Sequence, residues 1–151
     1  FELRIEMAGW KRIDILKTIP AGQLSQAFVA MWFDPTMKDY YENGIKKAIE
    51  HDEKYKSIKI DLVEHNNDIT DQIIAEIRRS KFVVADFTEN RGGVYYEAGF
   101  AQGLGLPVIW TVRDDFFHKI HFDTRQYNHI TYKTPEELFE KLLNRIRATI
   151  I

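Results

Sequence analysis

Residues 82–107, FVVADFTENRGGVYYEAGFAQGLGLP, contain the pattern that decides the fold. An apolar run over 82–85 ends abruptly in Asp86, as expected for a buried strand that leaves a sheet. A polar loop and a pair of glycines follow, and the spacing then predicts a helix over 94–104, stopped by a glycine and a proline. The stretch therefore predicts a buried strand that passes through a glycine turn into the N-terminus of a helix.

Two carboxylates lie at the edges of that turn. Asp86 ends the strand, and Glu97 follows about one turn into the helix. Val94, Glu97, Ala98 and Ala101 recur at helical spacing, so Glu97 shares the apolar face that we expect to pack on the sheet. Poor solvation of a carboxylate there favours its protonated form and raises its pKa. Two acids in different environments beside a helix N-terminus indicate a functional site and not a solvated surface.

Working outward, apolar strands alternate with amphipathic helices along the rest of the chain. This order predicts an α/β fold, Rossmann-like or flavodoxin-like, with helices on both faces of a five-stranded, doubly wound parallel sheet of order 2-1-3-4-5. The strands are expected over 26–33, 57–62, 82–86, 107–112 and 129–132. Further helices are expected over 35–51, from Asp68 onward, and at the end of the chain, where Thr134 and Glu137 form a capping box.

In this topology the switch point falls between the first and third strands, at their carboxyl ends. Ligands of doubly wound sheets bind at such points, so the residues that follow these two strands are the candidate site. They are Trp32, Phe33 and Asp34 after the first strand, and Asp86, Arg91, Gly92, Gly93, Tyr96 and Glu97 after the third.

Length and composition bound the class of protein. The chain has 151 residues, enough for one domain with a real core, and we assign residues 24–151 to that domain and 1–23 to an extension or linker of a longer chain. A net charge of -2 without a Lys/Arg run argues against a nucleic-acid partner. Cysteine is absent and no stretch approaches 18 apolar residues, which predicts no thiol chemistry and no membrane partner and favours a cytoplasmic protein.

Asp86 and Glu97 have a functional and a structural interpretation. Two carboxylates across a cleft can cleave a glycosidic bond, one attacking or stabilising the sugar carbon and the other assisting the leaving group. Alternatively, Asp86 caps the strand end and Glu97 is a surface residue. We favour the first interpretation, because a glutamate is seldom placed on the packing face of a helix.

The glycine pair and the aromatic residues also have two interpretations each. Gly92 and Gly93 form either a backbone nest for a phosphate or sugar hydroxyl, with Arg91 as an anion contact, or a tight turn that needs positive φ. Trp32 and Phe33 either stack on a base or belong to the core. The remaining candidates carry less weight: Asp34 as a helix cap, Tyr40, Tyr95 and Tyr96 as rings near the cleft, and His65, Asn66 and Asn67 in the loop after the second strand.

A metal site is not expected. His118, His121 and Asp123 resemble a ligand set, but their spacing in a loop without further ligands is weak evidence. We therefore predict neither a metal nor a cofactor.

The segments FVAMWF, IRRSKFVVADFT, RGGVYYEAGFAQGLGLPVIWT and HFDTRQYNHI resemble the nucleoside 2-deoxyribosyltransferase-like family, which is related to TIR-type NAD-cleaving domains. The resemblance spans about residues 26–150. It implies that Glu97 is the nucleophile, that Asp86 binds the sugar, and that copies of the chain assemble into a homo-oligomer. The chain departs from the family in reading AMWFDP after the first strand, and it lacks the C-terminal Asn-bearing segment that completes a neighbouring subunit's site. It is similar to domains appended to longer bacterial proteins, which implies N-glycosidase activity on nucleotides or NAD.

Our leading hypothesis is N-glycosidic bond cleavage or transfer on a nucleoside, nucleotide or NAD-like substrate. The main alternative is a non-catalytic, nucleotide-sensing module of a larger signalling or defence protein. A phosphoacceptor receiver domain is disfavoured, because the acidic pair and the lysine that it needs are not in place.

Overall fold

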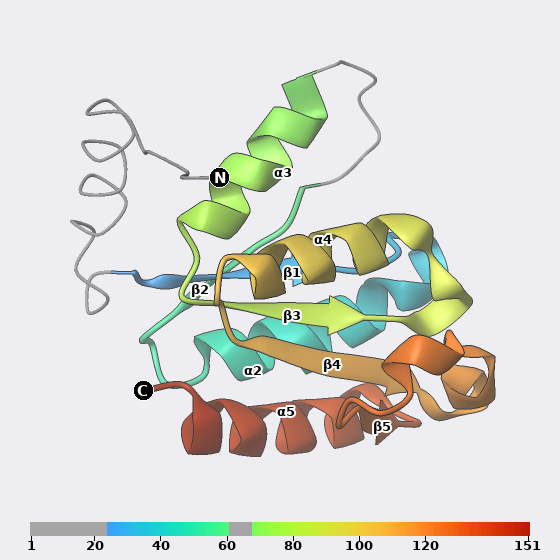
Figure 1. Cartoon of the computed structure of the whole chain (residues 1–151). Coiled ribbons are helices and arrows are strands. Elements are labelled where there is room, and N and C mark those ends of the chain that lie inside the picture. The colour runs from blue at the N-terminus through green and yellow to red at the C-terminus, as the bar shows by residue number, and fades with distance from the viewer. Residues whose placement is uncertain (1–23, 61–67) are drawn as a thin grey trace, which may run out of the picture.

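The computed structural model describes residues 24–60 and 68–151. Five strands form one sheet in which all neighbours are parallel and the order is β2-β1-β3-β4-β5 (Figure 1). The predicted fold class and strand order are confirmed. The predicted extension over 1–23 and the loop with His65, Asn66 and Asn67 lie outside the described residues. The strands are β1 (Gln26–Ala30), β2 (Lys56–Ile58), β3 (Phe82–Asp86), β4 (Val108–Arg113) and β5 (Ile130–Tyr132).

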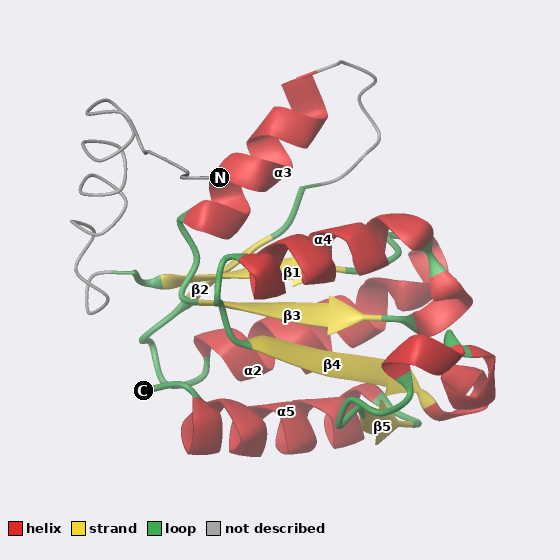
Figure 2. Cartoon of the chain, viewed as in Figure 1, coloured by secondary structure: helices red, strands yellow, loops and turns green. Residues whose placement is uncertain are grey.

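Helices cover both faces of the sheet (Figure 2). One face is covered by α3 (Asp68–Arg78) and α4 (Gly92–Gly103), and the other by α2 (Lys47–Glu50) and α5 (Pro135–Thr149), as Figure 1 shows. None of these helices in the described part of the chain is long and apolar enough to cross a membrane.

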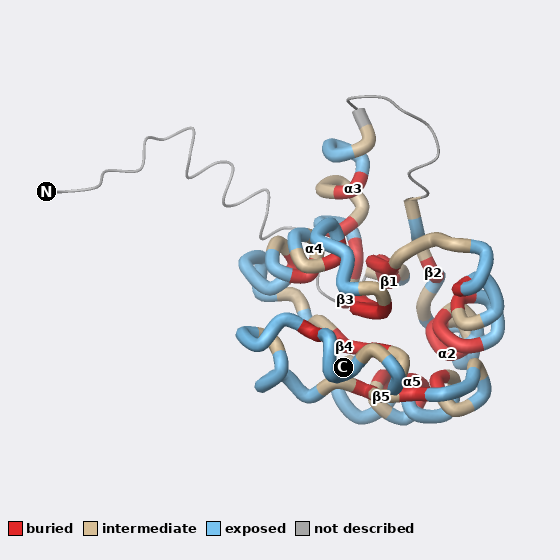
Figure 3. Tube along the Cα trace, turned by 90° about the vertical axis from the view of Figure 1, so that its right-hand side faces the viewer, coloured by how far each residue is buried: buried red, intermediate tan, exposed pale blue. Residues whose placement is uncertain are grey.

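The core lies on both sides of the central strands. Alternate residues of a strand point to opposite faces, so Ala27 and Val29 of β1 pack toward α2 and α5, whereas Phe28 and Ala30 pack toward α3 and α4. Every residue of β3 is buried, and Figure 3 shows the tube of β3 in the colour of buried residues. Burial on both faces explains why these strands read as continuous apolar runs.

The helix predicted over 35–51 is correct in extent and wrong in type. The segment begins as a 3-10 turn, η1 (Pro35–Met37), and has two α-helical residues at 38–39. It continues as a π-helix, η2 (Tyr40–Lys46), and is α-helical again in α2. Apolar spacing is too coarse a signal to distinguish i+4 from i+5 hydrogen bonding. Gly44 lies inside η2 where α5 packs closest, and a Cβ there would stand 2.9 Å from Leu138 Cδ2.

Other boundaries also differ from the prediction. The first strand ends at Ala30 and not at residue 33, because Trp32 and Phe33 leave the ladder and pack half-buried against the core. The predicted second strand over 57–62 forms a ladder only over Lys56–Ile58 in the described chain. Between β4 and β5 the chain forms two 3-10 turns, η4 (Asp114–Lys119) and η5 (Phe122–Thr124).

The capping box of α5 forms with one change of partner. Thr134 Oγ1 accepts a hydrogen bond from the N–H of Glu137, as predicted. The Glu137 carboxylate accepts from the N–H of Lys133, at 2.8 Å, and not from that of Thr134. Glu137 also pairs with Lys141, which fixes its side chain one turn into the helix.

Candidate functional site

The carboxyl ends of β1 and β3 are neighbours, and from there the chain turns to opposite faces of the sheet. After β1 it enters η1 and η2 on one face, and after β3 it enters α4 on the other. This is the topological switch point where α/β sheets bind ligands. Arg91, just before α4, lies with its guanidinium carbon 4.5 Å from the centre of the Trp32 ring. The structure thus brings together two of the predicted site residues from the two sides of the switch point.

The turn between β3 and α4 is built differently from the prediction. Neither Gly92 nor Gly93 has a positive φ, which contradicts one of the two interpretations of the glycine pair, the tight turn that needs it. The left-handed positions are instead Glu89, at φ 66°, and Asn90, at φ 53°. Asparagine tolerates this conformation because its short polar side chain bonds locally. Here Asn90 Oδ1 accepts a 2.6 Å hydrogen bond from the hydroxyl of Tyr95, a ring on the second turn of α4.

The N-terminus of α4 is open. The helix begins at Gly92, and Arg91 at its N-cap makes no side-chain capping hydrogen bond within the described chain. A Cβ added to Gly92 or Gly93 would meet no atom within 4 Å. The first N–H groups of a helix have no partner inside it, so these exposed glycines leave donors accessible to a ligand. Neither backbone conformation nor close packing explains two glycines at this position.

Glu97 lies on one flank of α4. Val94, Ala98 and Ala101 are buried against the sheet, and the 100° step of the helix places Glu97 beside this buried face. Side chains on a helix lean toward its N-terminus, so Glu97 leans over the turn that starts four residues earlier at Gly93. That turn carries no side chain on this flank.

The Glu97 carboxylate has no internal partner. It is half-buried and makes no hydrogen bond or ion pair with any residue in 24–60 or 68–151. Burial raises its pKa to about 7, as the sequence pattern predicted in direction. The ionised and protonated forms are therefore both accessible near neutral pH, which suits a nucleophile or an acid/base group.

Asp86 is in the opposite situation. It is completely buried, and its oxygens accept hydrogen bonds from the N–H of Thr88 and from the hydroxyls of Thr111, at 2.6 Å, and Tyr132, at 2.7 Å. Burial raises the pKa of Asp86, and these three hydrogen bonds oppose that rise. Asp86 therefore joins the ends of β3, β4 and β5 and presents no atom to solvent.

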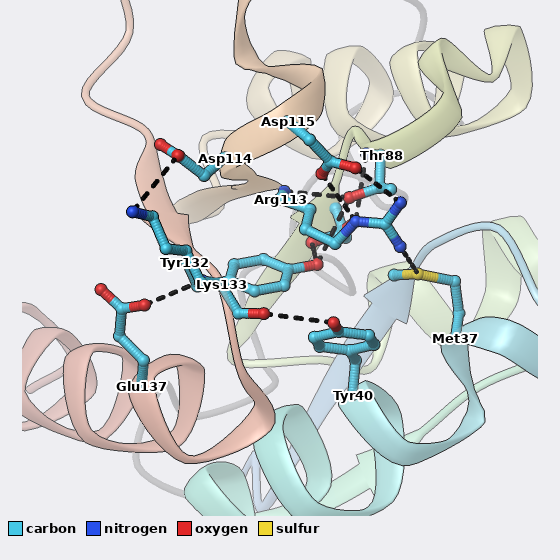
Figure 4. A network of polar contacts seen from close by, with 10 residues as sticks. Met37, Tyr40, Thr88, Arg113, Asp114, Asp115, Tyr132, Lys133 and Glu137 are labelled. Atoms are coloured by element: carbon cyan, nitrogen blue, oxygen red, sulfur yellow. Dashed lines mark hydrogen bonds and ion pairs between the residues drawn. The ribbon is translucent and has the colours of Figure 1, made fainter.

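Two partners of Asp86, Thr88 and Tyr132, belong to a larger network at the carboxyl end of the sheet (Figure 4). Thr88 Oγ1 accepts from the N–H of Arg113 at 3.0 Å and lies 3.3 Å from the Tyr132 hydroxyl. The Arg113 guanidinium donates to both carboxylate oxygens of Asp115, at 2.7 and 2.9 Å. The sequence argument missed Thr88, Thr111 and Tyr132. The sequence shows only that each of these residues carries a hydroxyl near the end of a strand. The pairing of Asp86 with Thr111 becomes visible once the register of β3 and β4 is known.

Of the other predicted site residues, Phe33 and Asp34 belong to the chain after β1, and Tyr96 precedes Glu97 on α4. Asp34 caps η1, accepting from the N–H of Thr36 at 3.0 Å, so its predicted capping role is confirmed. Phe33 and Asp34 line a hollow of about 380 Å³ on the face of the sheet that carries η2, and neither Glu97 nor Asp86 lines it. Tyr96 is 56% exposed on α4.

The histidines and carboxylates in the described ranges form no metal-binding group. No three such side chains gather there as ligands, and His121 makes only a 3.5 Å ion pair with Asp123. No protein-family model and no curated protein matches the sequence. The geometry of the switch point is therefore the basis on which a function is inferred.

Proposed function

We propose that the protein cleaves, or transfers, the N-glycosidic bond of a nucleoside, nucleotide or NAD-like substrate. The observation that carries the proposal is Glu97. It is a half-buried carboxylate that has no partner among the described residues and a pKa of about 7, and it lies beside an open helix N-terminus at the switch point of a doubly wound sheet. The resemblance of the surrounding sequence to deoxyribosyltransferases supports the same assignment.

Glu97 acts in this proposal as the nucleophile or as the stabiliser of the oxocarbenium-like carbon. Its carboxylate attacks the anomeric carbon, the bond from that carbon to the base nitrogen breaks, and the base leaves with the bonding electrons and takes up a proton. Water, or the nitrogen of a second base, then attacks the same carbon and releases Glu97. Only the ionised carboxylate performs the first step.

The neighbouring groups supply binding. Arg91 and the free N–H groups of Gly92 and Gly93 hold sugar hydroxyls or a phosphate, and Trp32 borders the base. We assign Asp86 a positioning role, because a substrate atom reaches its carboxylate only if a bond from Thr111, Tyr132 or Thr88 is exchanged. It holds the strand ends in register beneath the site.

The test is base release measured by chromatography, from a panel of nucleosides, nucleoside monophosphates and NAD. Wild-type protein should release free base from one class, and Glu97→Gln should reduce release by at least about a thousandfold, as expected for loss of a nucleophile. Glu140→Gln, which alters an exposed glutamate of α5, is the matched control and should retain full activity. Near wild-type release by Glu97→Gln would overturn the assignment.

A second function is favoured by one specific observation. Of the two carboxylates expected to share the chemistry, Asp86 is fully buried, so only Glu97 is accessible to a ligand. A nucleotide-sensing module needs the open helix N-terminus and the Trp32–Arg91 pair but no second carboxylate. Saturable nucleotide binding by calorimetry, without base release over a long incubation, would establish the sensor and exclude the enzyme.

A further inference from the structure

The hollow that contains Phe33 and Asp34 is not used by the proposed chemistry. Its volume of about 380 Å³ falls in the range of small-molecule sites. One wall comes from the chain after β1, and the other from η2, whose Tyr41 and Glu42 line it. π-Helical segments are rare, and they are frequently found at functional sites. The presence of η2 in the wall of the hollow is therefore a reason to ask what the hollow binds.

Aromatic rings form the apolar wall of the hollow. Phe33 and Tyr41 meet edge to face, with ring centres 6.1 Å apart and planes at 83°. Tyr41 is fixed from behind, because its buried hydroxyl lies 3.1 Å from that of Ser57 on β2. Two rings at right angles, one of them anchored, offer a preformed corner for a planar group.

The cationic side of the hollow is Lys59. Its ammonium group lies 4.9 Å from the centre of the Phe33 ring and 4.5 Å from that of Tyr41. The position is favourable for a cation over aromatic faces, and it holds the charge at the aromatic corner rather than out in solvent.

The charged groups of the hollow leave a small excess of positive charge. Glu42 pairs with Lys46 at 3.2 Å, whereas Asp34 accepts hydrogen bonds only from Thr36 and keeps its negative charge. Lys38 and Lys59, which also line the hollow, make no hydrogen bond or ion pair with any residue of the described ranges. A ligand that enters therefore meets aromatic faces, the ionised Asp34 and two lysines that have no counter-ion among the described residues.

We infer that this hollow is a binding site for a small molecule that joins a planar ring to a phosphate-like anionic group. The ring packs in the corner of Phe33 and Tyr41, and the anion pairs with Lys59 and Lys38. The hollow borders the switch-point site, because the pKa of Asp34, which the hydrogen bonds from Thr36 lower most, is also lowered by Arg91, which lies over Trp32. It has its own lining, which includes neither Glu97 nor any other residue of α4. The inference does not depend on the proposed reaction.

The experiment uses phenyl phosphate as the probe, since it carries a ring and a phosphate but no glycosidic bond. Titration into ¹⁵N-labelled full chain should shift the backbone amide signals of Phe33, Lys38, Tyr41 and Lys59 in a saturable manner. Inorganic phosphate and phenol, which each supply one half of the probe, should bind at least about tenfold more weakly, because each loses one set of contacts.

Variants decide whether the contacts named here are responsible. Lys59→Gln should weaken phenyl phosphate binding about tenfold, the loss expected for a charge-assisted bond. Lys47→Gln is the matched control, because Lys47 also lies over a ring, that of Phe139 at 4.8 Å, outside the hollow. It should leave the affinity unchanged. Absence of saturable shifts, equal weakening by both variants, or shifts centred on α4 would overturn the inference, whatever the outcome of the base-release assay.

Discussion

Ionisation of Glu97 should cost the folded protein stability, and replacing this residue should remove that cost. Burial raises the pKa of Glu97 from 4.5 to about 7 in the folded state. Between these values the folded protein keeps a proton that the unfolded chain has lost. The free energy of unfolding therefore falls as pH rises through this window and levels off above it. Glu97→Gln has no proton to lose and escapes the penalty.

The two pKa values fix the size of the effect. Linkage gives a penalty below about 1 kcal/mol at pH 5 and of about 3 kcal/mol at pH 8. Relative to wild type, Glu97→Gln should therefore be more stable at pH 8 than at pH 5 by about 2 to 3 kcal/mol. Other groups titrate over the same range, but they are common to both proteins and cancel in this double difference.

The assay is urea unfolding of both proteins at the two pH values, followed by circular dichroism and analysed at fixed slope. Glu140→Gln on the exposed side of α5 serves as the control, with an expected double difference near zero. A double difference below about 0.5 kcal/mol for Glu97→Gln would refute the reasoning, because it would mean that Glu97 ionises as freely in the folded protein as in the unfolded chain.

Three further predictions concern the site and its supports. The kcat/KM of the proposed reaction should rise with pH and level off above about 7, because ionised Glu97 is the active form; a fall over that range would make Glu97 a general acid. Tyr132→Phe should lower the free energy of unfolding by about 1.5 to 3 kcal/mol, because the hydrogen bond to Asp86 is lost. Tyr127→Phe is the control, because the hydroxyl of Tyr127 bonds to no described residue, and it should leave the free energy unchanged in the same urea assay. Gly44→Ala should destabilise by about 1 to 2 kcal/mol, because a Cβ would overlap Leu138, whereas Gly99→Ala, in open space on α4, should stabilise by about 0.5 to 1 kcal/mol; thermal unfolding compares the two.

The fold could be predicted because its signals are local and repeated. Apolar runs bounded by Asp86 and Gly105 mark where β3 and α4 end, and right-handed crossovers then leave few sheet orders. Gly105 shows the local logic: it has φ +78°, and the following N–H, of Leu106, donates to Ala101 O at 3.0 Å, which closes α4 as predicted. Such a signal needs no knowledge of the rest of the structure.

The site could be predicted only in part, because its chemistry depends on contacts between distant segments. Helical spacing placed Glu97 at the packing side of α4, and its raised pKa followed from that position. The fate of Asp86 did not, since its burial depends on hydroxyls from β4 and β5 that meet it only in the assembled sheet. The π-helix likewise has no distinct apolar spacing, so the hollow beside it was not predictable.

Two features of α4 lack an explanation in the fold itself, and both occur in its first two turns. Glu97 destabilises the protein when it ionises, whereas a glutamine there would pack without that cost. Gly92 and Gly93 have neither positive φ nor crowded surroundings, so alanine would favour the helix more at both positions. Residues that lower stability without a structural need are expected where a protein contacts a ligand. Glu97 leans over the turn at which Gly93 has no side chain. A single bound substrate that contacts this turn would therefore account for all three residues, Glu97, Gly92 and Gly93.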